Sequence, residues 1–361
     1  MRRDLYLRPL GLYAARADGA DEVWGGLRLA GGWLDFTAIE LLERKGGKVH
    51  RRITGLGDFF DRDWGRRTLA AADMFEALRA PRVPLAGLAL DRPRLMGIVN
   101  VTSDSFSGDG LYTSAQAAID HALRLEEEGA EILDIGAEST RPGADPVPLD
   151  EELRRLMPVI EGLAGKTRAL LSVDTRKAEV MRRAASAGID ILNDVSALTH
   201  DPEALSAAAE TGLPVILVHA RGDPRTMQQN PRYDNVLLDV FDHLEGRIAA
   251  CEAAGIPRAK IVVDPGIGFG KTFEHNLQLL NGVSLLHALG APILVGASRK
   301  RFIGALTRVE TPHERVAGSI GAALAAAAQG VQILRVHDVA ATRQALTVWE
   351  AAGRGAPRDR G

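Results

Sequence analysis

From about residue 92 onward, short apolar runs alternate with longer stretches in which apolar residues recur at helical spacing. Each run is almost continuously apolar, as expected for a strand of a parallel sheet that is buried on both faces. Eight runs follow this pattern: 95–101, 131–137, 169–175, 190–195, 214–220, 261–266, 292–298 and 332–338. The helical stretches between them include 114–128, 151–163, 177–187, 236–254 and 273–289. Eight strand–helix units in about 270 residues predict an α/β fold, a (β/α)8 barrel of the TIM type. A doubly wound sheet is the alternative architecture.

The beginning of the chain lacks this alternation. It holds three of the four tryptophans, Trp24, Trp33 and Trp64, together with short strand-like runs and one helical pattern over 66–78. A proline-rich stretch at 81–84 is typical of a linker. We therefore expect two parts, an N-terminal extension of unknown role over residues 1–85 and the barrel over residues 86–361.

Composition narrows the class of protein. Apolar residues make up 46% and charged residues 25% of the 361, with a net charge of −3, which is typical of a globular chain and untypical of a nucleic-acid binder. Cys251 is the only cysteine, so the chain can form neither an intrachain disulfide nor a thiolate zinc site. No apolar run approaches the roughly 20 residues that span a bilayer, and the first residues lack the apolar core of a signal peptide. These features predict a soluble, cytoplasmic protein that binds neither nucleic acid nor membrane.

Polar residues follow almost every predicted strand. A single charge at a strand end is usually a solvated rim residue or a helix cap, but in a barrel all strand ends meet at one mouth, where active sites are built. The strand-end set as a whole therefore indicates one polar site. Its members are Asn100, Asp134, Asp174, Thr175, Asn193, Asp194, His219, Asp264, Ser298, Arg299, Lys300, Arg335 and His337.

Three loops suggest what this site holds. Residues 100–110 are polar and glycine-bearing, residues 138–143 carry Arg141, and residues 298–301 concentrate cations. Cations beside an amide and carboxylates favour a phosphorylated substrate with Mg²⁺, although a basic run can also be plain solvated surface. The segment 265–272 mimics a phosphate-binding loop, but Pro265 stands where that motif needs glycine, so its glycines predict a tight turn.

Seven segments resemble the dihydropteroate synthase family, in order, between about residue 92 and residue 350. They are MGIVNVTSDSFS (96–107), DIGAESTRPGA (134–144), SVDT (172–175), LNDV (192–195), DPGIGFGK (264–271), GASRK (296–300) and RVHD (335–338). The resemblance implies a barrel transferase of folate biosynthesis and a target of sulfonamides. Such an enzyme joins p-aminobenzoate to 6-hydroxymethyl-7,8-dihydropterin diphosphate and releases pyrophosphate.

The resemblance also implies roles for individual residues. A pterin-recognition set is implied for Asp174, Asn193, Asp264 and Lys300. A p-aminobenzoate pocket is implied for Thr140, Arg141, Pro142, Phe269 and Ser298, with Lys300 beside it. Diphosphate contacts are implied for Asn100, Arg141, Arg335 and His337, with Asn100 also holding Mg²⁺. Asp134 resembles a carboxylate that orders these loops. The residues expected to carry the chemistry are Asn100, Asp134, Arg141, Asp174, Lys300, Arg335 and His337.

The segments depart from the family pattern at a few positions. Ser103 replaces a proline, Gly108–Asp109 inverts the usual order, and Arg301 replaces a serine that many members have. A related pterin-binding methyltransferase barrel is one alternative, although it would not need the 138–143 loop or the 298–300 cluster. A non-catalytic pterin-binding homologue is another.

One predicted helix has a face that bears on whether the chain forms a dimer. The helical pattern over 314–328 presents a face of small residues, Ala317, Gly318, Gly321, Ala322 and Ala325. Such a face lets a helix of a second subunit approach closely, or it only lets this helix lie close to its own barrel. The family resemblance implies a homodimer.

Overall fold

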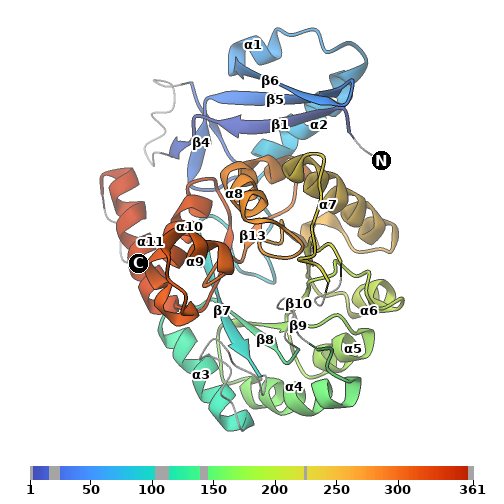
Figure 1. The fold of residues 1–361 in the computed structure, drawn as a ribbon, viewed down its shortest axis with the longest axis vertical. Coiled ribbons are helices and arrows are strands. Elements are labelled where there is room, and N and C mark those ends of the chain that lie inside the picture. The colour runs from blue at the N-terminus through green and yellow to red at the C-terminus, as the bar shows by residue number, and fades with distance from the viewer. Residues whose placement is uncertain (1–2, 16–24, 102–113, 139–144, 223–225, 357–361) are drawn as a thin grey trace.

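The computed structural model describes residues 3–15, 25–101, 114–138, 145–222 and 226–356 (Figure 1). Its centre is a parallel eight-stranded sheet with the order β12-β11-β10-β9-β8-β7-β14-β13. The strands are β7 (Arg94–Asn100), β8 (Ile132–Gly136), β9 (Leu170–Asp174), β10 (Ile191–Asp194), β11 (Val215–Val218), β12 (Ile261–Asp264), β13 (Leu294–Val295) and β14 (Ile333–Val336). The amide of Val263 donates to the Pro292 carbonyl at 2.9 Å, so the sheet nearly closes on itself. All eight expected strands form, and the predicted barrel is confirmed.

Helices surround the strands. They are α3 (Ala115–Glu127), α4 (Leu149–Leu163), α5 (Ala178–Ser186), α6 (Ala204–Thr211), α7 (Val236–Ala253), α8 (Phe273–Gly282), α9 (Arg301–Thr307), α10 (Val316–Ala327) and α11 (Val339–Arg354). The expected single helix over 273–289 is wrong in detail, because the chain tightens after Gly282 into the 3₁₀ helix η4 (Val283–Leu289). No helix in the described part is both long and apolar enough to cross a membrane.

Two apolar clusters fill the barrel. One lies inside the strands and includes Met96, Ile132, Ile216 and Ile333, and Leu85 joins it just before the first strand. The other lies between the strands and the surrounding helices. Because the interior is packed with side chains, a ligand can be held only at the mouth, where the strand ends lie.

The N-terminal residues form two small antiparallel sheets. One has the order β1-β5-β6, made of β1 (Leu5–Leu10), β5 (Ala38–Lys45) and β6 (Lys48–Gly55). The other has the order β2-β4-β3, made of β2 (Tyr13–Ala14), β4 (Leu34–Phe36) and β3 (Leu27–Arg28). Two helices follow, α1 (Leu56–Phe60) and α2 (Thr68–Arg79), the latter at the helical pattern expected over 66–78.

The sheet β1-β5-β6 packs against η4 of the barrel and lies beside α7 (Figure 1, blue). Tyr6 meets Phe241 of α7 edge to face, with ring centroids 5.3 Å apart. Trp33 donates to the Ala327 carbonyl of α10 at 3.2 Å. Both N-terminal residues and barrel helices contribute to one apolar cluster, so the extension shares a core with the barrel. Trp24 lies outside the described residues.

The small-residue face of α10 is only partly as expected. Ala317, Gly321 and Ala325 are exposed, whereas Ala322 is buried. A side chain at Gly318 would collide with Ile303, whose Cγ2 lies 2.4 Å from the ideal Cβ position. Ala322 and Gly318 therefore serve packing within the barrel, which corrects part of the predicted face.

Candidate active site

Asp134 is the centre of the polar cluster at the barrel mouth. It lies on β8, two residues before the strand ends, and is completely buried. Its Oδ1 accepts from the Ser172 hydroxyl at 2.7 Å, and its Oδ2 accepts from Arg335 Nε at 2.6 Å. Asn193 Nδ2 donates to both carboxylate oxygens, at 3.3 and 3.1 Å. Three other strands are thus tied to β8 by one carboxylate.

Asp174 stands at the end of β9, one layer nearer the mouth. Arg335 Nη2 donates to its Oδ2 at 3.0 Å, so one guanidinium bridges Asp174 and Asp134. Burial raises the pKa of Asp174 to about 7, the charge of Asp134 adds to the rise, and the Arg335 cation opposes it. The site therefore holds a carboxyl group that changes charge near neutral pH.

The amide of Asn193 leaves one polar atom without a partner. Its Nδ2 is used by Asp134, while its Oδ1 is buried and, among the described residues, has no hydrogen-bond partner. A buried acceptor without a donor is costly. This geometry fits a ligand that brings an N–H or O–H group to Asn193.

Asp264 ends β12 on another side of the mouth. Its Oδ1 accepts from the Gly266 amide at 2.6 Å, and burial raises its pKa although the Lys300 charge opposes this. Gly266, Gly268 and Gly270 all have positive φ, and a Cβ at Gly266 would lie 1.9 Å from the His219 carbonyl oxygen. The expected tight turn is confirmed, and only glycine fits at Gly266.

Lys300 lies across this turn. Its Nζ donates to the Ile267 carbonyl and sits 4.4 Å from the centroid of the Phe269 ring, a cation–π contact. Lys300 precedes α9 as its N-cap residue. The ammonium group and the aromatic ring, both predicted site residues, are therefore adjacent.

Ser298 and His337 meet on neighbouring strand ends. The Ser298 hydroxyl accepts from the His337 amide at 3.2 Å and lies 3.0 Å from His337 Nδ1. Arg299, between Ser298 and Lys300, turns elsewhere: its guanidinium binds both carboxylate oxygens of Asp338, at 3.0 and 2.6 Å. Arg299, one of the cations expected at the mouth, is therefore paired with Asp338.

Lys271 is a buried lysine that was not among the predicted site residues, although it ends the segment 264–271. It is 3% exposed, and its Nζ lies 2.9 Å from His219 Nδ1, 3.2 Å from the His219 carbonyl and 3.1 Å from the Phe269 carbonyl. Burial lowers the pKa of Lys271 and that of His219 well below their ordinary values. Lys271 thus holds the turn 266–270 against the end of β11.

A second buried charge network lies beside the mouth and was also missed. Glu138 accepts from Arg176 Nη2 at 2.7 Å and from Lys177 Nζ at 2.9 Å, and the same Nζ contacts Glu152. Glu138 Oε1 also accepts from the Val147 amide at 3.3 Å. One carboxylate therefore connects the two sides of the segment 139–144. In the sequence, Glu138 belongs to a loop and Glu152 to the start of a helical pattern with Asp150 and Glu151, so neither position indicated that the two would share Lys177.

Some predicted residues lie outside the described part of the chain, namely Thr140, Arg141, Pro142, Ser103 and Gly108–Asp109. Asn100 is described as the last residue of β7, paired in register with Gly136. The other predicted residues, on six strand ends and the adjacent turns, surround one mouth. Carboxylates, an orphaned amide oxygen and two cations can hold a planar ligand with N–H donors beside an anionic group.

The chain is similar to known proteins in both sequence and structure. The sequence pattern of the family described as pterin binding enzymes matches residues 96–337. The chain is 49% identical to dihydropteroate synthase of Escherichia coli (strain K12) over 264 residues, which are 73% of this chain and 93% of that protein. A Xanthomonas albilineans dihydropteroate synthase structure with 4-aminobenzoic acid is 55% identical, covers 75% of this chain and 98% of its own, and has a TM-score of 0.70. Its complex with 7,8-dihydropteroate is 50% identical, covers 76% and 98%, and has a TM-score of 0.67.

Proposed function

The chain belongs to the dihydropteroate synthase family of pterin-binding enzymes, and from this premise we propose how its own residues perform the family's reaction. That reaction joins p-aminobenzoate to 6-hydroxymethyl-7,8-dihydropterin diphosphate and releases pyrophosphate, which makes the protein a transferase. The observation that supports the assignment of residues is the buried, unpartnered Oδ1 of Asn193 among carboxylates whose pKa is raised by burial.

We assign pterin recognition to Asp174, Asn193, Asp264 and Lys300. The amino-pyrimidinone edge of a pterin presents N–H donors, which the carboxylates and the Asn193 amide oxygen can accept. Hydrogen bonds to a charged acceptor are stronger than neutral ones, especially in a dry site. Asp134 is a positioning residue in this scheme, since it orients Asn193 and Arg335 from below.

We assign the diphosphate to Asn100, Arg141, Arg335 and His337. A guanidinium has five N–H donors, so Arg335 can hold Asp134 and Asp174 and still donate to a diphosphate oxygen. These donors stabilise the negative charge that develops as the carbon–oxygen bond breaks and its electron pair leaves with the diphosphate.

The p-aminobenzoate side is assigned to Thr140, Arg141, Pro142, Phe269 and Ser298. The Phe269 ring offers a face for the aromatic substrate, and Lys300 lies beside it. The substrate's amine attacks the cationic methylene left on the pterin, forms the carbon–nitrogen bond and then loses a proton to solvent. An aromatic amine is already unprotonated at neutral pH, so positioning contributes more than a base would.

Members of the family use Mg²⁺, and we propose that Asn100 is its protein ligand here. The described residues contain no group of three or more His, Cys, Asp or Glu side chains that could hold a metal ion. A single amide oxygen nevertheless fits, because Mg²⁺ is commonly bound by one or two protein groups together with substrate phosphates. When bound, the ion neutralises charge on the leaving diphosphate.

The direct test is pyrophosphate release by the purified full chain with both substrates and Mg²⁺. We expect release that requires p-aminobenzoate and formation of 7,8-dihydropteroate. Pterin binding without release above the blank would show a non-catalytic homologue. Methyl transfer from a folate donor would show the related methyltransferase activity.

We further propose a homodimer and a cytoplasmic location. The exposed Ala317, Gly321 and Ala325 of α10 leave room for a second subunit. Light scattering that gives a particle of 38.7 kDa, the mass of one chain, would contradict the dimer. The location is supported by a single buried free cysteine, Cys251, since disulfides are typical of oxidising compartments.

A further inference from the structure

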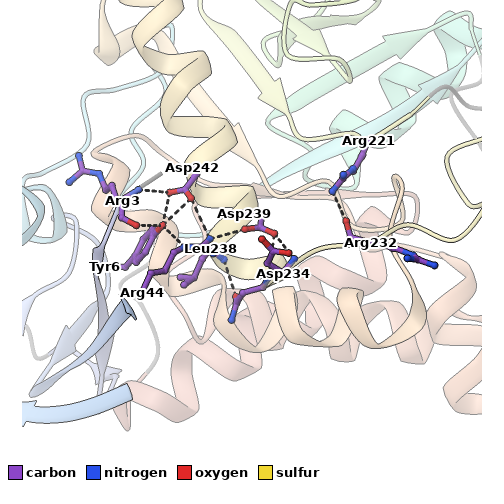
Figure 2. A network of polar contacts seen from close by, with 10 residues as sticks. Arg3, Tyr6, Arg44, Arg221, Arg232, Asp234, Leu238, Asp239 and Asp242 are labelled. Carbon is purple, nitrogen blue, oxygen red and sulfur yellow. Dashed lines mark hydrogen bonds and ion pairs between the residues drawn. The ribbon is translucent and has the colours of Figure 1, made fainter. Parts of the chain in front are cut away.

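The N-terminal sheet holds one face of α7 through charged hydrogen bonds (Figure 2). Arg44 of β5 donates from Nη2 to Asp239 Oδ1 at 2.7 Å and to Asp242 Oδ2 at 3.3 Å. The Tyr6 hydroxyl of β1 contacts both carboxylate oxygens of Asp242, at 2.7 and 2.9 Å, and accepts from Arg44 Nε at 3.0 Å. The side chains of Arg44 and Asp239 are only 16% and 13% exposed, so water screens this pair weakly.

Asp239 also contacts the segment that precedes α7. Its other oxygen, Oδ2, accepts from the amides of Asp234 and Asn235 at 2.9 and 3.3 Å. Asn235 is the N-cap of α7, and its side chain accepts from the Leu238 amide at 3.1 Å. One carboxylate thus joins the N-terminal sheet to the point where the β11–α7 loop enters the helix.

The same loop reaches the glycine turn of the candidate active site. Tyr233 donates from its hydroxyl to the Gly270 carbonyl at 2.8 Å, and Gln228 donates to the Gly268 carbonyl at 2.6 Å. Burial raises the pKa of Tyr233 to about 12, so the phenol keeps its proton and remains a donor. A Cβ at Gly270 would lie 2.3 Å from the Arg221 carbonyl oxygen, so loop and turn approach closely.

A cleft separates much of this loop from the helices behind it. Its two adjoining parts have volumes of about 650 and 370 Å³, and both are lined by Arg221, Tyr233 and Asp239. Beside this space the loop is held by the packing of Tyr233 against the core and against His275, with ring centroids 5.0 Å apart, and by its polar contacts. Removing one of them should therefore let the loop move.

We propose that the N-terminal sheet is a positioning element for the active site, and that Arg44 acts through Asp239 and Tyr233 to place the turn 266–270. That turn carries Phe269 and contacts Lys300, the residues assigned to the p-aminobenzoate side. The inference rests on the proposed function of this turn. It gives a role to residues that precede the family match at 96–337.

The test compares full-length Arg44→Ala, Arg44→Lys, Tyr233→Phe and the Arg44→Ala/Tyr233→Phe double variant by steady-state kinetics. We expect Arg44→Ala to raise KM for p-aminobenzoate about fivefold, the lower end of the range that is typical of coupling between two separate sites. KM for the pterin diphosphate and kcat should change much less, and Arg44→Lys should restore part of the loss. The double variant should be no worse than the poorer single variant, because both changes break one chain of contacts.

Arg67→Ala is the matched control. Arg67 bonds Glu43 at 2.8 Å and Asp4 at 3.1 Å within the extension, so its loss perturbs the sheet away from α7. We expect unchanged KM values for it. An unchanged KM for p-aminobenzoate in Arg44→Ala, an equal rise in Arg67→Ala, or additive effects in the double variant would overturn the inference.

A second readout does not depend on turnover. Amide hydrogen exchange over residues 226–240 should be faster in Arg44→Ala than in the wild type, and unaltered in Arg67→Ala. If the wild type shows no turnover, the proposed function fails while this coupling is still measured. Equal exchange in Arg44→Ala and the wild type would refute the positioning role by itself.

Discussion

Replacing Asp264 by asparagine should weaken pterin binding without lowering the free energy of unfolding. Asp264 is 5% exposed, and its Oδ1 accepts from the Gly266 amide at 2.6 Å. Asparagine has the same shape and keeps an oxygen for that bond. What disappears is the negative charge, and with it the charge-assisted hydrogen bonds to pterin N–H groups.

The size of the effect follows from the type of bond lost. A hydrogen bond to a charged group contributes about 1.5–3 kcal/mol, so the dissociation constant of a pterin should rise about 10–150-fold. The free energy of unfolding should not fall. The pKa of Asp264 is raised in the fold, so the folded protein binds more protons than the unfolded chain between the two pKa values. The ionised carboxylate therefore costs stability at neutral pH, and asparagine removes that cost.

Isothermal titration with a pterin, together with thermal unfolding, measures both quantities. Asp194→Asn is the matched control, because this buried carboxylate accepts from the Ser196 amide and hydroxyl and from the Leu198 amide. An asparagine there must point its NH₂ at one of these donors, so we expect a lower melting temperature with nearly unchanged pterin affinity. A strongly destabilised Asp264→Asn that binds pterin normally would show that our assignment of Asp264 is wrong.

Two further predictions concern pH and the glycine turn. Because the pKa of Asp174 is raised to about 7 by burial, pterin affinity should rise about tenfold per pH unit below that pKa and level off above it. Titrations across this range should give a flat profile for Asp174→Asn, and a wild-type-like profile would refute the role. Gly266→Ala places a Cβ 1.9 Å from the His219 carbonyl oxygen at a φ of +67°, so it should destabilise by about 1–3 kcal/mol and abolish turnover. Gly246→Ala, on α7 with nothing within 4 Å, should instead stabilise by about 0.5–1 kcal/mol in thermal unfolding, and equal losses in both variants would contradict the steric reasoning.

The architecture of the barrel could be predicted from the chain alone. Strand and helix periodicity are local properties, and a run buried on both faces is recognisable wherever it occurs. The eight runs therefore appear as β7 to β14, and the polar residues at their ends surround one mouth, as barrel geometry requires. The turn at 266–270 was likewise predictable, because its closely spaced glycines favour positive φ.

Side-chain partnerships could not be predicted in this way, because they join residues far apart in the sequence. Asp134 binds Asn193 and Arg335, which lie 59 and 201 positions away, and Arg299 binds Asp338 instead of facing a ligand. No local pattern distinguishes a cation that meets a substrate from one that meets a carboxylate.

The contact between the N-terminal extension and the barrel is another pairing that the sequence did not predict. The tryptophans and short strand-like runs of the extension distinguished it from the barrel, but nothing in its sequence identified α7 as a helix that it contacts. Arg44 and Asp239 are 195 positions apart and meet only when sheet and barrel are packed together. Local sequence determined which segments become strands and helices, because those preferences depend on near neighbours. The tertiary structure decided which charges pair, because pairing requires the complete fold to bring distant residues within hydrogen-bond distance.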